Sequence, residues 1–309
     1  MAIAVFSIVL GLIIGSFLSV CIYRIPLGRG SGLEELTSEE SDETDLSSER
    51  DLPPNSPHFE KRVSISYPPR SFCPSCGKQL RWFHNIPLLS WLALGGKCAY
   101  CKTQISIRYP LVEVLSAFFC FLSVQLFYSS PGGSLATAVL AYILCCVLVV
   151  ISFIDIDYYI IPNVITYPAV VIGLVLALLN TYFSFLAFPF VPGIQEAGLG
   201  LLVGAGVLLF ISEVYLRLRR KHGLGMGDVK LLAVTGVFFG FEGAVYTIFF
   251  GSLIGSFLGI GLMLVGRGGM SKYLPFGPYL ALANLLYIFT GPTFLIAFMG
   301  FIRSTIYGM

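Results

Sequence analysis

Long apolar stretches alternate with short polar connections along most of the chain, and this alternation predicts its architecture. About 20 apolar residues in a helix can cross a hydrocarbon core of about 30 Å. Because isolated strands cannot satisfy their backbone groups in lipid, we expect an all-α multi-pass membrane protein with about eight transmembrane helices. The eight stretches cover residues 1–20, 110–129, 135–154, 163–182, 197–217, 229–240, 243–265 and 274–291.

Composition agrees with this interpretation. Of the 309 residues, 56% are hydrophobic and 12% are charged, whereas a soluble domain carries about 25% charged residues. The first stretch has a rival interpretation as a secretory signal peptide, but its basic residues, Arg24 and Arg29, follow the apolar run instead of preceding it. The net charge of +2 does not indicate a nucleic-acid partner. The expected surroundings are a lipid bilayer.

The distribution of basic residues predicts the orientation of the helices. Lys and Arg are absent from the connections 129–134, 182–198 and 240–243, which would then face outward. The basic residues gather in the alternate connections, so we expect these in the cytoplasm, with the N-terminus and the C-terminus outside. The basic residues concerned are Arg24, Arg217, Arg219, Arg220, Lys221, Lys230, Arg267 and Lys272.

The chain has one long polar region, residues 24–109, between the first helix (1–23) and the helical core (110–291), which a C-terminal segment (292–309) follows. Within it, an acidic insertion covers about 31–70. Its segment Glu34–Asp51 holds nine acidic residues and few apolar ones, so we expect disorder. An alternative function for this segment is docking of a basic partner.

Two cysteine pairs predict a metal site in the following segment, about 71–108. Cys73 and Cys76 form one C-x2-C motif, and Cys98 and Cys101 form another after a gap of 21 residues. Two such turns can supply the four thiolates of a tetrahedral zinc site, which has no open coordination position and is therefore structural. Disulfides or free thiols are the alternatives, but the expected cytoplasmic location is reducing. We therefore expect a zinc-ribbon-like domain inserted after the first helix.

Two carboxylates lie at the predicted cytoplasmic ends of apolar stretches. Asp155 ends the third stretch, shortly before a Pro162–Asn163 turn, and Asp228 opens the sixth behind Gly225-x-Gly227. The glycines would allow a sharp bend and close approach of a peptide. Asp157, two residues from Asp155, would point to a different helix face. Helix capping is the alternative function for Asp228, since Asp is a favoured N-cap residue.

Two carboxylates at one depth of the membrane suggest acid–base chemistry. If they approach closely, both cannot ionise cheaply, and the pair shares a proton. One carboxylate can then activate water while the protonated one polarises a peptide carbonyl, as in aspartic proteases. The chain has three His, none of them in an apolar stretch, so a His-based catalytic triad is not indicated.

Several segments together resemble one known family. The segments are Gly15–Pro26, the two cysteine pairs, Ser90–Leu92, Arg108–Glu113, the two aspartate motifs and Leu274–Ala281. In this order the chain resembles the type IV prepilin peptidases, bifunctional leader peptidase/N-methyltransferases that belong to the GxGD membrane aspartic proteases. The chain departs from the family pattern at Ser19, where Asn is usual, and in the length of its acidic insertion.

The resemblance implies a function and its residues. It assigns catalysis to Asp155, seven residues before Pro162, and to Asp228, with Gly225, Gly227, Lys230, Pro162 and Asn163 as supporting motif residues. The enzyme would cut prepilins or pseudopilins after the Gly that ends a basic leader, at the cytoplasmic face of the bacterial inner membrane. It would then methylate the new N-terminal residue with S-adenosylmethionine. Glu113 is a candidate contact for this donor. Components of pilus or type II secretion assemblies are possible further partners.

Two other classes of function use part of the same pattern. A proton-coupled transporter would also place carboxylates within the membrane, but its sites usually lie near the midplane in repeated halves, and no repeat of this kind is evident in the sequence. A membrane-anchored zinc adaptor without catalysis would leave the Gly225–Asp228 motif unexplained.

Overall fold

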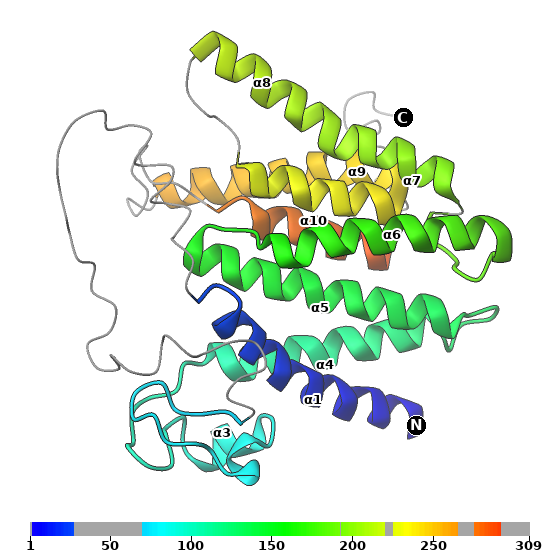
Figure 1. Cartoon of the computed structure of the whole chain (residues 1–309). Helices are drawn as coiled ribbons and strands as arrows, with labels where there is room; N and C mark the ends of the chain where they lie inside the picture. Colours follow the sequence, from blue (N-terminus) through cyan, green and yellow to red (C-terminus); the bar gives the residue numbers. More distant parts are fainter. Residues whose placement is uncertain (1, 28–69, 192, 220–224, 265–274, 292–309) are drawn as a thin grey trace, which may run out of the picture. The chain divides into compact units, whose positions relative to one another are not determined.

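The computed structural model describes residues 2–27, 70–191, 193–219, 225–264 and 275–291 (Figure 1). These residues form helices and turns, and within these ranges the only β-type pairings are two isolated bridges. The all-α prediction is therefore confirmed. The acidic segment Glu34–Asp51 and the C-terminal segment 292–309 lie outside the described residues.

A helix occupies each of the eight apolar stretches. Six helices in the described part of the chain are long and apolar enough to cross a membrane, and α10 is a shorter apolar helix. The multi-pass prediction is therefore confirmed. The helices are α1 (Ala2–Arg24), α4 (Arg108–Phe127), α5 (Leu135–Tyr158), α6 (Asn163–Phe183), α7 (Ile194–Leu201) continued by the π-helical segment η3 (Leu202–Gly206) and α8 (Val207–Arg219), α9 (Met226–Leu264) and α10 (Gly277–Thr290).

The long helix α9 contains the sixth and seventh apolar stretches. Gly240 interrupts it with φ 69° and ψ −163°, a backbone conformation that is not helical. Glycine adopts positive φ without the steric cost of a Cβ atom. The interruption coincides with the expected boundary between residues 229–240 and 243–265.

The chain is divided into two compact units. The first contains the described residues up to Gln125 together with Asp157–Tyr159, and the second contains Leu126–Ile156 and the described residues from Ile160 onward. Each unit is described separately below.

In the first unit, α1 packs closely against α4 through glycines one turn apart. A Cβ atom at Gly11 would lie 2.5 Å from the Cα of Ala117, and one at Gly15 would lie 2.6 Å from the Cα of Glu113. Lipid is as apolar as a leucine side chain, so helices in membranes associate through such close backbone contacts. The short helices η2 (Trp82–Asn85) and α3 (Leu89–Ala93) lie between the two cysteine pairs.

In the second unit, α9 packs on α6, α7 and α10, and the axis of α5 runs in roughly the same direction as that of α6 (Figure 1). Glycines again make the closest contact. A Cβ atom at Gly200 would overlap the carbonyl oxygen of Gly236, and one at Gly204 would overlap the carbonyl of Leu232. Side chains that are fully buried in this unit include Ile151, Ile154, Leu231, Leu232, Tyr246, Leu280 and Ile288.

Candidate functional site

Asp155 lies near the end of α5 and is 5% exposed. Its Oδ2 accepts a hydrogen bond of 3.0 Å from the backbone N–H of Gly277, the first residue of α10. The N-terminal N–H groups of a helix lack partners within the helix, and the helix dipole there favours a negative charge. The start of α10 therefore stabilises the carboxylate form of Asp155.

Asp228 lies in the first turn of α9 and is partly buried. Its backbone N–H donates to the carbonyl of Gly225 at 3.1 Å. Within the described ranges, its side chain forms no hydrogen bond with a backbone N–H of α9, so the capping alternative has no support there. The carboxylates of Asp155 and Asp228 are close enough to interact electrostatically. The structure thus brings the two predicted acids together.

Ile161 connects the segments that carry the two acids. Its side chain lies 3.0 Å from the position of a Cβ atom at Gly227 and 3.2 Å from that of a Cβ atom at Gly277. A side chain at either glycine would collide with Ile161 or with the Asp155 carboxylate, which is 2.6 Å from a Cβ atom at Gly277. The starts of α9 and α10 and the end of α5 therefore converge at this residue.

Neither Gly225 nor Gly227 has positive φ. Gly227 provides a close approach to Ile161. Gly225 is exposed, and a Cβ atom there would lie 3.2 Å from Oδ2 of Asp228. The two glycines therefore leave room for packing and for the Asp228 carboxylate.

A hydrogen bond between Lys230 and Asn163 joins the start of α9 to the start of α6, next to Pro162. Pro162 is the N-cap residue of α6, and Asn163 is its first residue. The Lys230 ammonium donates a hydrogen bond of 2.7 Å to Oδ1 of Asn163 and lies 5.5 Å from the centre of the Tyr167 ring. These supporting residues therefore position the turn that carries Asp228.

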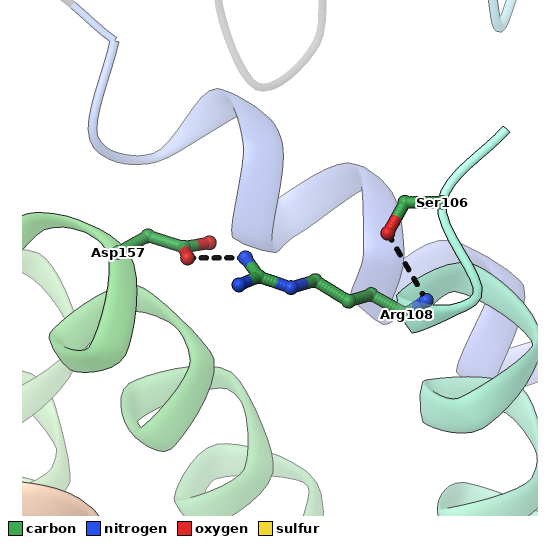
Figure 2. A network of polar contacts seen from close by, with 3 residues as sticks. All are labelled: Ser106, Arg108 and Asp157. Carbon is green, nitrogen blue, oxygen red and sulfur yellow. Dashed lines mark hydrogen bonds and ion pairs between the residues drawn. The ribbon is translucent and has the colours of Figure 1, made fainter. Parts of the chain in front are cut away.

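Asp157 has a different environment, as expected from its place on the helix. It forms an ion pair with Arg108, whose backbone N–H donates to Oγ of Ser106 at 3.3 Å (Figure 2). The side chains of Arg108 and Asp157 are 51% and 28% exposed. The ion pair gives Asp157 a role in the packing of the first unit, separate from the Asp155–Asp228 pair.

The four cysteines of the first unit form a compact cluster. The Sγ atoms of Cys73, Cys76, Cys98 and Cys101 all lie within 4.8 Å of one another. The sulfurs of Cys73 and Cys101 are 3.8 Å apart, and a tetrahedral site with Zn–S bonds of about 2.3 Å separates its sulfurs by roughly that distance. The donor set and its spacing fit zinc.

The two cysteine pairs lie on nearly identical turns that repeat after 25 residues. Cys73 N–H donates to the Lys78 carbonyl at 3.0 Å, and Cys98 N–H donates to the Thr103 carbonyl at 2.9 Å. The residue after the second cysteine is left-handed in both turns: Gly77 has φ 67° and Lys102 has φ 61°. Each turn thus presents two sulfurs to the same point.

The protonation of these thiols depends on their surroundings. Burial raises the pKa of the Cys73 thiol to about 12. Hydrogen bonds with the side chain and backbone of Thr103 lower the pKa of the exposed Cys101 thiol to about 6. Because the thiolate is the metal ligand, an ion that binds here has to displace the proton of Cys73.

Glu113 lies in α4 and is 8% exposed. It accepts hydrogen bonds from the backbone N–H of Leu88, at 2.7 Å from Oε2, and from the Ser16 hydroxyl. His84 is half-buried, and its Nδ1 is fully buried.

Sequence reasoning missed two residues of the aspartate site, Gly277 and Ile161. Gly277 lies in the segment Leu274–Ala281, which contributed to the family resemblance, but no role was predicted for Gly277 itself. The Gly277–Pro278 pair is the one available signal, because Pro is common in the first turn of a helix and marks where α10 begins.

Two protein-family models match the chain, one mainly in each unit. Residues 9–127 match the Bacterial Peptidase A24 N-terminal domain, and residues 142–260 match the Type IV leader peptidase family. No solved structure matches the chain.

Several similar proteins carry the name prepilin leader peptidase/N-methyltransferase. One from Aeromonas salmonicida (strain A449) is 37% identical over 282 residues, which is 91% of this chain and 88% of that protein. One from Burkholderia pseudomallei (strain 1026b) is 33% identical over 94% of this chain and 86% of its own length. One from Neisseria gonorrhoeae is 36% identical over 91% of this chain and 88% of its own length. The chain therefore belongs to the type IV leader peptidase family of prepilin leader peptidase/N-methyltransferases.

Proposed function

We propose that this protein cleaves the leader from prepilins by an aspartic protease mechanism at the cytoplasmic face of the membrane and methylates the new N-terminus. Family membership supports both activities. The observation that carries the cleavage mechanism is the meeting of Asp155 and Asp228, from different helices, where α9 and α10 begin.

The geometry suggests a division of roles between the two acids. Asp155 receives the N–H of Gly277 at the start of a helix, which favours its charged form, so we assign to it the removal of a proton from the attacking water. Asp228 would be the protonated partner and give its proton to the oxygen of the scissile carbonyl as the water oxygen bonds to its carbon. The proton held by Asp155 then passes to the amide nitrogen, the C–N bond breaks, and a hydroxyl of the diol intermediate returns a proton to Asp228.

Matched Asp→Asn substitutions test this assignment. Asp155→Asn and Asp228→Asn should each lower the cleavage rate by a factor on the order of 10² to 10⁴. Asp157→Asn, two residues from Asp155 and paired with Arg108, should retain most of the activity. Mass spectrometry of a prepilin incubated with purified protein, with and without S-adenosylmethionine, reports the cut and the methyl group together. Cleavage at the wild-type rate by Asp155→Asn would refute the assignment.

We also propose that Cys73, Cys76, Cys98 and Cys101 hold one structural zinc ion. Four thiolates complete the coordination of the ion, which would stabilise the fold and take no part in cleavage. Elemental analysis should find one zinc per chain in the wild-type protein and none in Cys76→Ser/Cys101→Ser. Cys120→Ser, at a buried cysteine outside the cluster, is the matched control and should keep the metal.

The distribution of basic residues supports one orientation in the membrane. We propose that the two aspartates and the cysteine cluster face the cytoplasm of a bacterial inner membrane and that the N-terminus lies outside. A membrane-impermeant maleimide should label Ser130→Cys in intact spheroplasts and Arg217→Cys only after permeabilisation, above the background of the unsubstituted protein. The reverse pattern would refute this topology.

A further inference from the structure

The first unit contains a cavity of about 260 Å³ that neither the aspartate pair nor the cysteine turns explain. Small-molecule sites range upward from about 300 Å³, so the cavity lies just below that range. We infer that this cavity binds S-adenosylmethionine. The inference rests on the methyltransferase activity of the proposed function and assigns that activity a site, whose lining includes Tyr23, Arg24, His84, Trp91, Tyr109 and Glu113.

The cavity combines two opposite charges on buried residues. Arg24 at the end of α1 is 7% exposed, and Glu113 in α4 is 8% exposed. S-adenosylmethionine carries an α-carboxylate, an α-ammonium and a sulfonium, so a cavity with one group of each sign is complementary to it. A purely apolar or uniformly charged cavity would leave at least one of these groups without a counter-charge.

Glu113 has capacity for a cationic ligand. Its two hydrogen-bond donors, the N–H of Leu88 and the Ser16 hydroxyl, are neutral, and within the described ranges no Lys or Arg forms an ion pair with it. A carboxylate has about four acceptor positions, so two remain for a further partner. The close packing of Gly15 on the backbone of Glu113 places Ser16 beside this carboxylate. Buried carboxylates in membrane helices are costly and usually functional.

Aromatic residues provide surfaces for the adenine ring. Trp91 is held in place by a hydrogen bond of 3.2 Å from its Nε1 to the Ile105 carbonyl. Gly96, with φ 68°, lets the backbone approach this indole, because a Cβ atom there would lie 3.0 Å from Cζ2. Tyr23 and Tyr109 line the same cavity. Stacking on such rings is a common mode of nucleobase binding.

His84 brings a polar atom without a hydrogen-bond partner among the described residues to the same cavity. Its Nδ1 is buried and has no hydrogen-bond partner among the described residues, while its ring packs against Phe83 and Tyr100. A buried polar atom without a partner is unusual. In the tautomer that carries its proton on Nε2, this atom can accept a hydrogen bond from the exocyclic amino group of adenine.

The reaction at this site balances without a further reactant. The new N-terminal ammonium gives one proton to water, and the lone pair of the free amine then forms a bond to the methyl carbon. The carbon–sulfur bond breaks, and its electron pair stays on sulfur. The positive charge moves from the sulfonium to the methylated amine, and the other product is a neutral thioether.

Donor binding to the full-length protein tests the site without relying on turnover. Equilibrium dialysis with labelled S-adenosylmethionine should show at least about tenfold weaker binding to Glu113→Gln, which keeps the shape and acceptor oxygen of the side chain. His84→Phe, which keeps a ring against Phe83 and Tyr100, should weaken binding about fivefold. Glu213→Gln, at an exposed glutamate outside the cavity, is the matched control and should bind as the wild type does.

Three outcomes separate this inference from the proposed function. Leader cleavage and zinc content at wild-type levels in Glu113→Gln and His84→Phe establish that the variants are folded, and weaker donor binding then supports the site. Affinities within twofold of wild type in both variants, with methylation by the wild type intact, overturn the site and leave the proposed function standing. A wild-type protein that neither binds the donor nor methylates a cleaved prepilin overturns both.

Discussion

The backbone N–H of Gly277 and the carboxylate of Asp155 form a hydrogen bond of 3.0 Å across 122 positions of the chain. It joins the start of α10 to the end of α5. Because a helix start is also a site of positive potential, the contact both places the Asp155 side chain and favours its charge. Gly277, which belongs to the late segment used for the family resemblance, therefore helps to position the Asp155 carboxylate.

Gly277→Ala should lower the rate of leader cleavage strongly. The added Cβ atom would lie 2.6 Å from Oδ2 of Asp155 and 3.2 Å from Ile161, so the carboxylate has to move. Displacement of a reacting group by about 1 Å can cost on the order of 10²-fold in rate. The measurement is the initial rate of prepilin cleavage by purified protein.

The control for this substitution is Gly261→Ala, where a Cβ atom meets nothing within 4 Å. It should cleave at the wild-type rate. Equal rates in the two variants would show that the close approach of Gly277 to Asp155 has no catalytic consequence.

Gly200→Ala should destabilise the second unit, because its Cβ atom would overlap the Gly236 carbonyl and force α7 away from α9. Overpacking of this kind costs about 1–3 kcal/mol. Gly198→Ala, two residues earlier on α7, adds a methyl group into open space and should leave stability unchanged or slightly raised. Thermal unfolding in detergent compares the two; a similar melting temperature for both would contradict the importance of the glycine contact.

Lys102→Gly should stabilise the second cysteine turn. Lys102 has φ 61°, a conformation that costs a non-glycine residue about 1–2 kcal/mol. Glycine removes this cost, but it also loses more conformational entropy on folding, which offsets part of the gain. We expect a net gain of roughly 0.5–1 kcal/mol, visible as metal release at a higher concentration of chelator.

Lys97→Gly makes the same change in the bridge of Lys97 with Gln104, where φ is not positive. It should weaken metal retention. We therefore expect Lys102→Gly to raise the chelator concentration needed for metal release and Lys97→Gly to lower it. A lower concentration for Lys102→Gly would mean that the Lys102 side chain contributes more to metal retention than its backbone conformation costs.

The Arg108–Asp157 ion pair should contribute little to stability, since both side chains are partly exposed and such pairs are typically worth less than about 1 kcal/mol. A double-mutant cycle of Arg108→Gln and Asp157→Asn, followed by thermal unfolding, measures the coupling. Addition of salt should reduce it further. A coupling above about 2 kcal/mol would contradict this estimate.

Apolar length and cysteine spacing were sufficient to predict the helices and the metal-type cluster, since each depends on local properties of the chain. The packing partners of the helices could not be predicted in the same way. In lipid the outer face of a helix is as apolar as its inner face, so periodicity does not identify the packed side. Phe6 and Phe17 of α1, for example, are 66% and 57% exposed.

Glycine spacing carried information that we did not use. Gly11 and Gly15, Gly200 and Gly204, and Gly236 and Gly240 are each four residues apart, the spacing of close helix contacts in membranes. The contact of Asp155 with Gly277 had no comparable signal, because it depends on how three helix ends meet. The repeat of the cysteine turns after 25 residues was visible in the sequence and predicts their equivalence.

Cys73 and Cys98 belong both to the four-sulfur cluster and to the wall of the cavity beside Glu113, whereas Asp155 and Asp228 lie in the other unit. With zinc and the methyl donor bound as proposed, a bacterium starved of zinc should lose the two activities unequally. Its pilin subunits would be trimmed at the normal position but would retain a primary amine at their first residue.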